Sequence, residues 1–182
     1  MSSVSQTPRR GRIGFGSWFA ISMVAVALIL WLALGASGAN ILRLAGQGRL
    51  HAPDLALFAA LSTPIKVHLL AALAALVLGA VLMLARKGRR FHRTAGWAWV
   101  GLVSLTAGST LFITSLNHGG WSVLHLFTAW TLIILPLAVT WAKQRRVARH
   151  RRAMMGLFYG GFAINLFIAF IPGRTLWAMF FG

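Results

Sequence analysis

Five apolar stretches of this chain are each long enough to cross a lipid bilayer as a helix. A hydrocarbon core of about 30 Å takes about twenty helical residues. The whole chain has one acidic side chain, Asp54, and 58% of its residues are hydrophobic, which leaves too little polar surface for a soluble protein. The sequence therefore predicts an all-α, polytopic membrane protein with five transmembrane helices, at residues 17–37, 65–85, 94–116, 121–142 and 153–171.

The polar segments between these stretches divide the chain. No convincing small-residue cleavage site follows the first apolar stretch, so we expect it to be retained as a helix. The apolar piece at 55–60 is too short to cross, and we expect it to lie at the interface or to cap the bundle. The predicted parts are a basic N-terminal tail (1–16), the first transmembrane helix (17–37), an outer loop with the interfacial piece (38–63), a four-helix transmembrane core (64–174) and an outer C-terminal tail (175–182).

Fourteen of the eighteen Lys and Arg residues fall on one side of the predicted helices. Basic loops face the cytoplasm, so this asymmetry predicts a cytoplasmic N-terminus and a C-terminus on the opposite side. The other four basic residues, Arg43, Arg49, Lys66 and Arg174, are then on the outer side. The tryptophans near predicted helix ends are expected to anchor the helices at the interfaces; they are Trp18, Trp97, Trp99, Trp121, Trp141 and Trp177.

The net charge of +17 does not indicate nucleic-acid binding, because the cations cluster in short segments between apolar runs. That pattern is typical of contact with anionic lipid headgroups. Cysteine is absent, which excludes disulfides and thiolate ligands, and one carboxylate cannot perform two-carboxylate acid–base catalysis. Anionic lipid, other membrane subunits and a redox partner are the partners that the sequence favours.

Four histidines on the predicted core helices form two levels. His68 and His125 each lie seventeen residues before the inner end of their helix, about 25 Å above it and close beneath the outer surface. His92 and His150 lie at the inner ends of the helices at 94–116 and 153–171. Ionisable side chains in a membrane usually face the bundle interior, and two imidazoles from facing helices are common axial ligands of haem b. The pattern predicts haem b at the outer pair and at the inner pair.

Haem propionates require nearby cations. Lys66 and Arg174 are the candidates at the outer level, and Arg93 and Arg151 are candidates at the inner level. Asn165, in the middle of the fifth predicted helix, fits either packing or contact with a quinone.

Each histidine also has an explanation without haem. His92 and His150 precede arginines and fit contacts with lipid phosphates, whereas His68 and His125 fit hydrogen bonds between helices. His118 is expected in a tight outer turn and His51 in the solvated outer loop. The sequence leaves open whether two haems, one or none are bound.

Several segments are similar to one family. They are KVHLLAALAALVLGAVLML, KGRRFHRTAGWAW, GGWSVLHLFTAWTLIIL, RHRRAMMGLFYGG and IPGR. Together they resemble an uncharacterised family of small bacterial membrane proteins, a predicted-membrane domain of unknown function, over residues 63–174. The resemblance implies a location in the inner membrane of a bacterium. The family has no assigned activity that could be transferred to this chain.

The order of the four histidines is similar to that of the transmembrane dihaem b-type cytochromes of the ascorbate-reducible class. That likeness implies pairing of the first histidine with the third and of the second with the fourth, which here pairs His68 with His125 and His92 with His150. The intervals are shorter than in those proteins and no ascorbate-site motif is present, so the electron donor and acceptor stay open.

The leading hypothesis is a membrane-embedded b-type haem protein that passes electrons between quinol or another reductant and a partner. Whether it is itself an oxidoreductase or an electron-carrier subunit is not decided by the sequence. The alternative is a haem-free accessory or assembly subunit of a larger membrane complex. A reduced-minus-oxidised spectrum separates the two.

Overall fold

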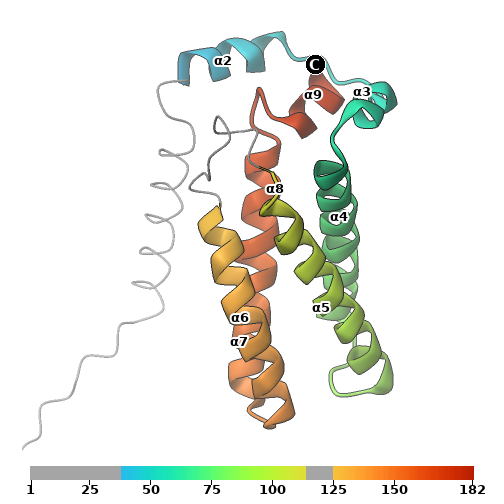
Figure 1. The fold of residues 1–182 in the computed structure, drawn as a ribbon, viewed down its shortest axis with the longest axis vertical. Helices are drawn as coiled ribbons and strands as arrows, with labels where there is room; N and C mark the ends of the chain where they lie inside the picture. Colours follow the sequence, from blue (N-terminus) through green and yellow to red (C-terminus); the bar gives the residue numbers. More distant parts are fainter. Residues whose placement is uncertain (1–37, 114–124) are drawn as a thin grey trace, which may run out of the picture. The chain divides into compact units, whose positions relative to one another are not determined.

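The computed structural model describes residues 38–113 and 125–182, in which every regular element is helical (Figure 1). The predicted helix at 17–37 and the turn that contains His118 lie outside these residues. The long elements are α4 (Thr63–Leu84), α5 (Arg90–Thr110), α6 (His125–Lys143) and a continuous helix of α7 (Val147–Gly156), η3 (Leu157–Ala163) and α8 (Ile164–Ala169). Shorter helices are α2 (Gly38–Gln47), α3 (Leu55–Ala60) and α9 (Thr175–Phe181).

A tight turn joins α4 to α5 and decides where α5 begins. The ammonium group of Lys87 donates hydrogen bonds to the carbonyl oxygens of Met83 and Ala85, which no helical N–H reaches. Gly88 has a φ of +80°, a conformation that glycine adopts without a steric penalty. The helix then starts at Arg90, four residues before the predicted 94–116. The local turn, and not the onset of the apolar run, therefore sets this boundary.

The last long helix contains a π-helical segment, η3, which the apolar pattern did not reveal. The side-chain amide of Asn165 donates a 2.7 Å hydrogen bond to the Gly161 carbonyl within this region. On the same helix, Gly160 lies close to the Trp130 ring of α6, where an added Cβ would be 3.4 Å from the ring. A wider turn shifts the angular position of the residues that follow it, so η3 changes which side chains face the neighbouring helices.

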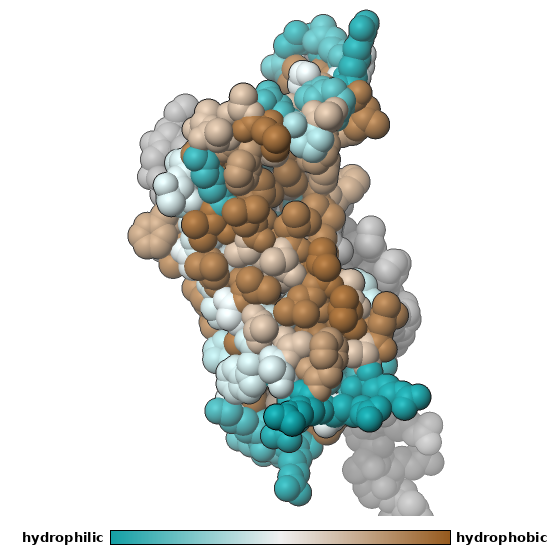
Figure 2. Space-filling model, turned by 90° about the vertical axis from the view of Figure 1, so that its right-hand side faces the viewer, coloured by the Kyte–Doolittle hydropathy of each residue, from teal (hydrophilic) through white to brown (hydrophobic). Residues whose placement is uncertain are grey.

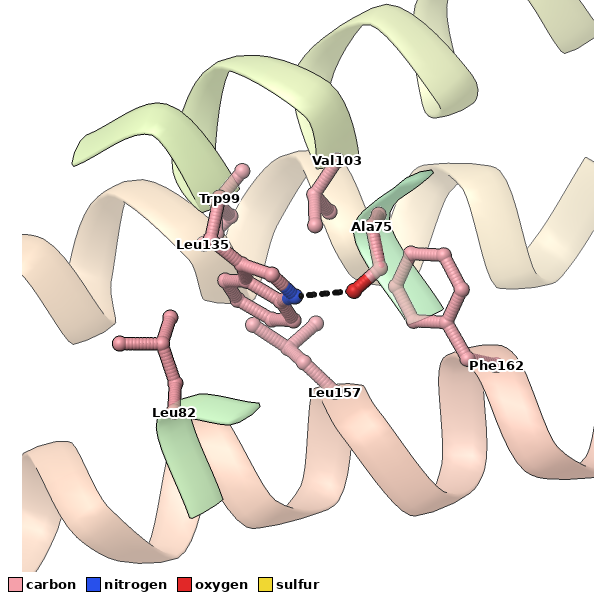
Figure 3. Packing of buried hydrophobic residues seen from close by; sticks show 7 residues of the cluster. All are labelled: Ala75, Leu82, Trp99, Val103, Leu135, Leu157 and Phe162. Carbon is pink, nitrogen blue, oxygen red and sulfur yellow. Dashed lines mark hydrogen bonds between the residues drawn. The ribbon is translucent and has the colours of Figure 1, made fainter. Parts of the chain in front are cut away.

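The core is formed where α4, α5, α6 and η3 meet around Trp99 (Figure 3). The Trp99 ring is 4% exposed and lies 6.1 Å from the Phe162 ring, centroid to centroid. The prediction that Trp99 is an interfacial anchor is therefore wrong, because its position near a predicted helix end says nothing about which way the ring points. The buried members of this cluster are Ala75, Leu82, Trp99, Val103, Leu135, Leu157 and Phe162.

The segments predicted as the outer loop and the outer tail lie together at one end of the structure (Figure 1). The backbone N–H of His51 donates to the Phe180 carbonyl at 2.9 Å, and that of Asp54 donates to the Met179 carbonyl at 3.0 Å. The loop thus satisfies carbonyls at the end of α9. The Asp54 carboxylate accepts hydrogen bonds from the first backbone N–H groups of α3, as an N-cap residue does.

Within the described residues, Thr63–Leu84, His125–Lys143 and Val147–Ala169 are long and apolar enough to cross a membrane. Figure 2 shows the matching surface, a mainly apolar band between hydrophilic ends. The prediction of an all-helical membrane protein is confirmed. The helix α5 is of similar length but carries Arg90 and Arg93 as well as glycine, serine and threonine residues, and it is not among these three spans.

Candidate functional site

A largely apolar cavity of about 430 Å³, which we call the outer cavity, lies among α4, α5, α6, the last long helix and α9. Its volume falls within the range of small-molecule sites, about 300–1,000 Å³. Both histidines of the predicted outer pair, His68 and His125, line it, as does Arg174. The remaining polar residues of the lining are Thr106, Thr110, Thr128, Thr131, Asn165 and Thr175.

His68 lines this cavity from α4, and its ring is held by a hydrogen bond to α5. Its Nδ1–H donates a 3.0 Å hydrogen bond to the backbone carbonyl of Thr106 on α5. A carbonyl oxygen only accepts, so Nδ1 carries the proton and Nε2 of the neutral ring keeps its lone pair. Ser109 donates to the same carbonyl at 2.8 Å. Histidine ligands of metals are commonly held through such a second nitrogen, which fixes the ring and raises its basicity.

His125 begins α6 and is held one helical turn further along α5. Its Nε2–H donates a 3.1 Å hydrogen bond to the Thr110 carbonyl. This hydrogen bond holds the His125 ring against α5. Both outer histidines thus donate hydrogen bonds to backbone carbonyls of α5, although His68 is on α4 and His125 is on α6.

Threonine and serine hydroxyls on α5 and α6 lie beside the outer histidines, and the sequence reasoning missed them. Thr110 and Thr128 share a 2.7 Å hydrogen bond between their hydroxyl groups, across α5 and α6. Ser109 and Thr128 are buried. A signal was present in the sequence, because Thr106, Ser109 and Thr110 recur at helical spacing and lie level with the outer histidines.

The four predicted propionate partners are placed differently from one another. Arg174 lines the cavity. Lys66, by contrast, donates a 2.6 Å hydrogen bond to the Ala59 carbonyl at the end of α3. Arg93 and Arg151 are exposed at the other end of the long helices.

The predicted inner pair, His92 and His150, lies within α5 and α7 and does not line the outer cavity. The Nδ1–H of His150 donates a 3.0 Å hydrogen bond to the Ala138 carbonyl on α6. Among the residues that the structure describes, the Nδ1 of His92 is enclosed without a hydrogen-bond partner. Burial lowers the pKa of His92 below the ordinary value of 6.5, and the nearby charges of Lys87 and His150 lower it further.

Alanines and a glycine follow His68 along one face of α4, and such small residues suit either a flat macrocycle or close helix packing. Ala72 lines the cavity, but Ala75 and Gly79 lie against the core. A Cβ at Gly79 would be 2.6 Å from the Phe158 ring and 2.7 Å from the Trp99 indole nitrogen. Most of these small residues therefore allow α4 to pack closely against the core.

Within residues 38–113 and 125–182, no three histidine or acidic side chains are grouped as a site for a bare metal ion. Axial ligation of a haem takes two histidines, and the outer cavity has two.

Fold and site together define a class of protein, a helical membrane protein with a histidine-lined cavity among its long helices. The chain belongs to the family described as "Predicted membrane protein (DUF2306)", whose model matches residues 65–178. This confirms the resemblance over the long helices. No curated protein and no solved structure matches the chain. The likeness to dihaem cytochromes thus rests on the order of the histidines alone.

Proposed function

We propose that this protein is a membrane electron carrier that holds haem b in the outer cavity. The observation that carries the proposal is that His68 and His125, from two different helices, line one largely apolar cavity. Bound haem would supply one-electron redox chemistry, with quinol or another reductant as donor. A quinone is the competing occupant of the same cavity, with Asn165 among its contacts.

The chain's own residues have distinct roles in this proposal. His68 would hold the haem iron through Nε2, and its hydrogen bond to the Thr106 carbonyl orients the ring. His125 would hold the iron from α6. Arg174 neutralises a propionate at the edge of the cavity. The apolar lining excludes water and so influences the reduction potential.

The proposal includes five membrane-crossing helices, with the N-terminus in the cytoplasm of a bacterium. The first support is that fourteen of the eighteen basic residues lie on one side of the helices. The second is that residues 49–54 are hydrogen-bonded to α9 at the other end. In this arrangement α5 completes a four-helix core and crosses from about Thr94 onward, with its two arginines in the headgroup region.

A second haem at His92 and His150 remains a prediction. Its support is that both histidines lie at the same end of the long helices (Figure 1), where the Ala138 carbonyl fixes the His150 ring through Nδ1. Replacing either histidine with lysine separates the alternatives, because lysine preserves a contact with lipid phosphate but does not replace an axial imidazole.

The test is a reduced-minus-oxidised spectrum of the purified full-length protein. We expect b-type bands in the wild type, and loss of the outer haem from His68→Ala and from His125→Ala. His51→Ala is the matched control, because His51 lies in the outer loop and does not line the cavity. A folded, colourless wild-type protein would contradict the proposal and favour the haem-free accessory subunit.

A further inference from the structure

A second hollow, at the opposite end of α5, carries positive charge. Its volume is about 590 Å³, and Arg90, Arg93, Thr94 and Trp97 line it. Counted from Arg90, the other three residues follow at three, four and seven positions, so all four share one face of the helix. Two guanidinium groups, a hydroxyl group and an indole ring thus lie along a single concave strip.

A neighbouring helix adds a third cation to this strip. The Lys143 ammonium, from the last turn of α6, lies 5.6 Å from the centre of the Trp97 ring. That distance is within the range of a cation–π contact. The hollow is therefore bordered by basic side chains from two helices.

No acidic side chain of the chain is placed to neutralise these cations. Asp54 is the only one, and its carboxylate caps α3 before α4 begins. The twenty-two residues of α4 separate that end from the start of α5, a distance of about 33 Å. The counter-anion of the basic hollow must come from outside the chain.

We propose that this hollow binds the phosphate headgroup of one anionic phospholipid. Arg90 and Arg93 receive the phosphate, because guanidinium groups bind it through paired hydrogen bonds. The Trp97 ring is 58% exposed and lies one turn further along the helix, where an interfacial tryptophan contacts the glycerol region. The acyl chains then extend into the apolar part of the membrane. Basic pockets between membrane helices bind acidic headgroups in this manner.

The inference does not depend on haem in the outer cavity, because none of its residues lines that cavity. It assigns Arg93 to a lipid phosphate instead of to a propionate of an inner haem. Anionic phospholipid is the occupant to which we commit. Inorganic phosphate shares its chemistry, and a general attraction of the basic surface to membranes would produce a similar preference without a site.

Native mass spectrometry of the full-length protein, extracted from nanodiscs of mixed phosphatidylglycerol and phosphatidylcholine, tests the inference. We expect the wild type to retain one phosphatidylglycerol. Each arginine contributes about fivefold in affinity, so Arg90→Gln with Arg93→Gln should weaken retention about 25-fold. The matched control is Arg86→Gln with Arg152→Gln, which removes two exposed charges from the same end but none from the hollow.

Equal loss from both pairs of substitutions would overturn the inference, since it would indicate non-specific attraction. Full retention by the Arg90→Gln, Arg93→Gln variant would overturn it too. A charge-preserving variant, Arg90→Lys with Arg93→Lys, should retain more lipid than the glutamine pair and less than the wild type, and it guards against a folding defect. Equal thermal stabilisation by inorganic phosphate and by phosphatidylglycerol would identify a free-phosphate site instead.

Discussion

The indole nitrogen of Trp99 on α5 donates a 2.9 Å hydrogen bond to the backbone carbonyl of Ala75 on α4. The bond is buried, and the small side chain of Ala75 lets the ring approach the neighbouring backbone (Figure 3). An indole N–H that is enclosed away from water needs such a partner. This contact fixes the rotation of α5 against α4 at the centre of the core.

Replacing Trp99 with phenylalanine should destabilise the protein. The change removes the hydrogen bond and leaves part of the ring's volume unfilled, at a cost of about 1–3 kcal/mol. Thermal unfolding in detergent, followed by circular dichroism, measures the effect. Trp97→Phe is the control, because that ring is 58% exposed and should change the melting temperature much less. Equal melting temperatures for the two variants would contradict the role assigned to Trp99.

Adding a methyl group at Gly79 should also destabilise the core. The new Cβ would lie 2.6 Å from the Phe158 ring and would force α4 away from η3. Overpacking of this kind typically costs about 1–3 kcal/mol. The control is Gly101→Ala on α5, where a Cβ meets nothing within 4 Å and alanine favours the helix. A Gly79→Ala variant as stable as Gly101→Ala would show that the helices separate without penalty.

Stability should fall in mild acid because of His92. Burial, with the charges of Lys87 and His150, lowers the pKa of His92 in the folded state below the ordinary 6.5. The unfolded chain therefore binds the proton first as pH falls. The neutral His92 ring therefore contributes fully to the free energy of unfolding above its pKa in the unfolded chain. That contribution is lost as the pH falls through its pKa in the folded protein.

Melting temperatures between about pH 8 and pH 5 measure this dependence, over the range where histidine titrates. The His92→Gln variant should show a flatter profile than the wild type. His51→Gln, in the exposed outer loop, should keep the wild-type slope. An unchanged slope in His92→Gln would assign the acid sensitivity to another group.

The two ends of α4 should be accessible from opposite sides of the membrane. The chain has no cysteine, so single cysteines can be placed without a prior deletion. Ser62→Cys, just before α4, should react with an impermeant maleimide added outside, as should a cysteine appended after Gly182. Arg86→Cys should react only after the membrane is permeabilised. Labelling of Arg86→Cys from outside would reverse the proposed orientation.

Element positions were predictable to different degrees for physical reasons. The apolar run at 65–85 predicted α4 within two residues, because the run and the helix end at the same turn. The run at 94–116 placed the next helix four residues late at its start and six late at its end, since α5 covers Arg90–Thr110. The turn at Gly88 and the side-chain hydrogen bonds near Thr110 set those ends, and a hydropathy pattern registers neither.

Sequence alone determined that the protein is helical and membrane-embedded, and it put four histidines on the long helices. These properties follow from the length of each apolar run and the position of each charge along one segment. The tertiary structure decided that His68 and His125 line one cavity while Trp99 is buried away from any interface. Those outcomes depend on the rotation of each helix about its axis and on its neighbours. Successive residues turn by about 100° around a helix, so a shift such as that made by η3 redirects every side chain beyond it.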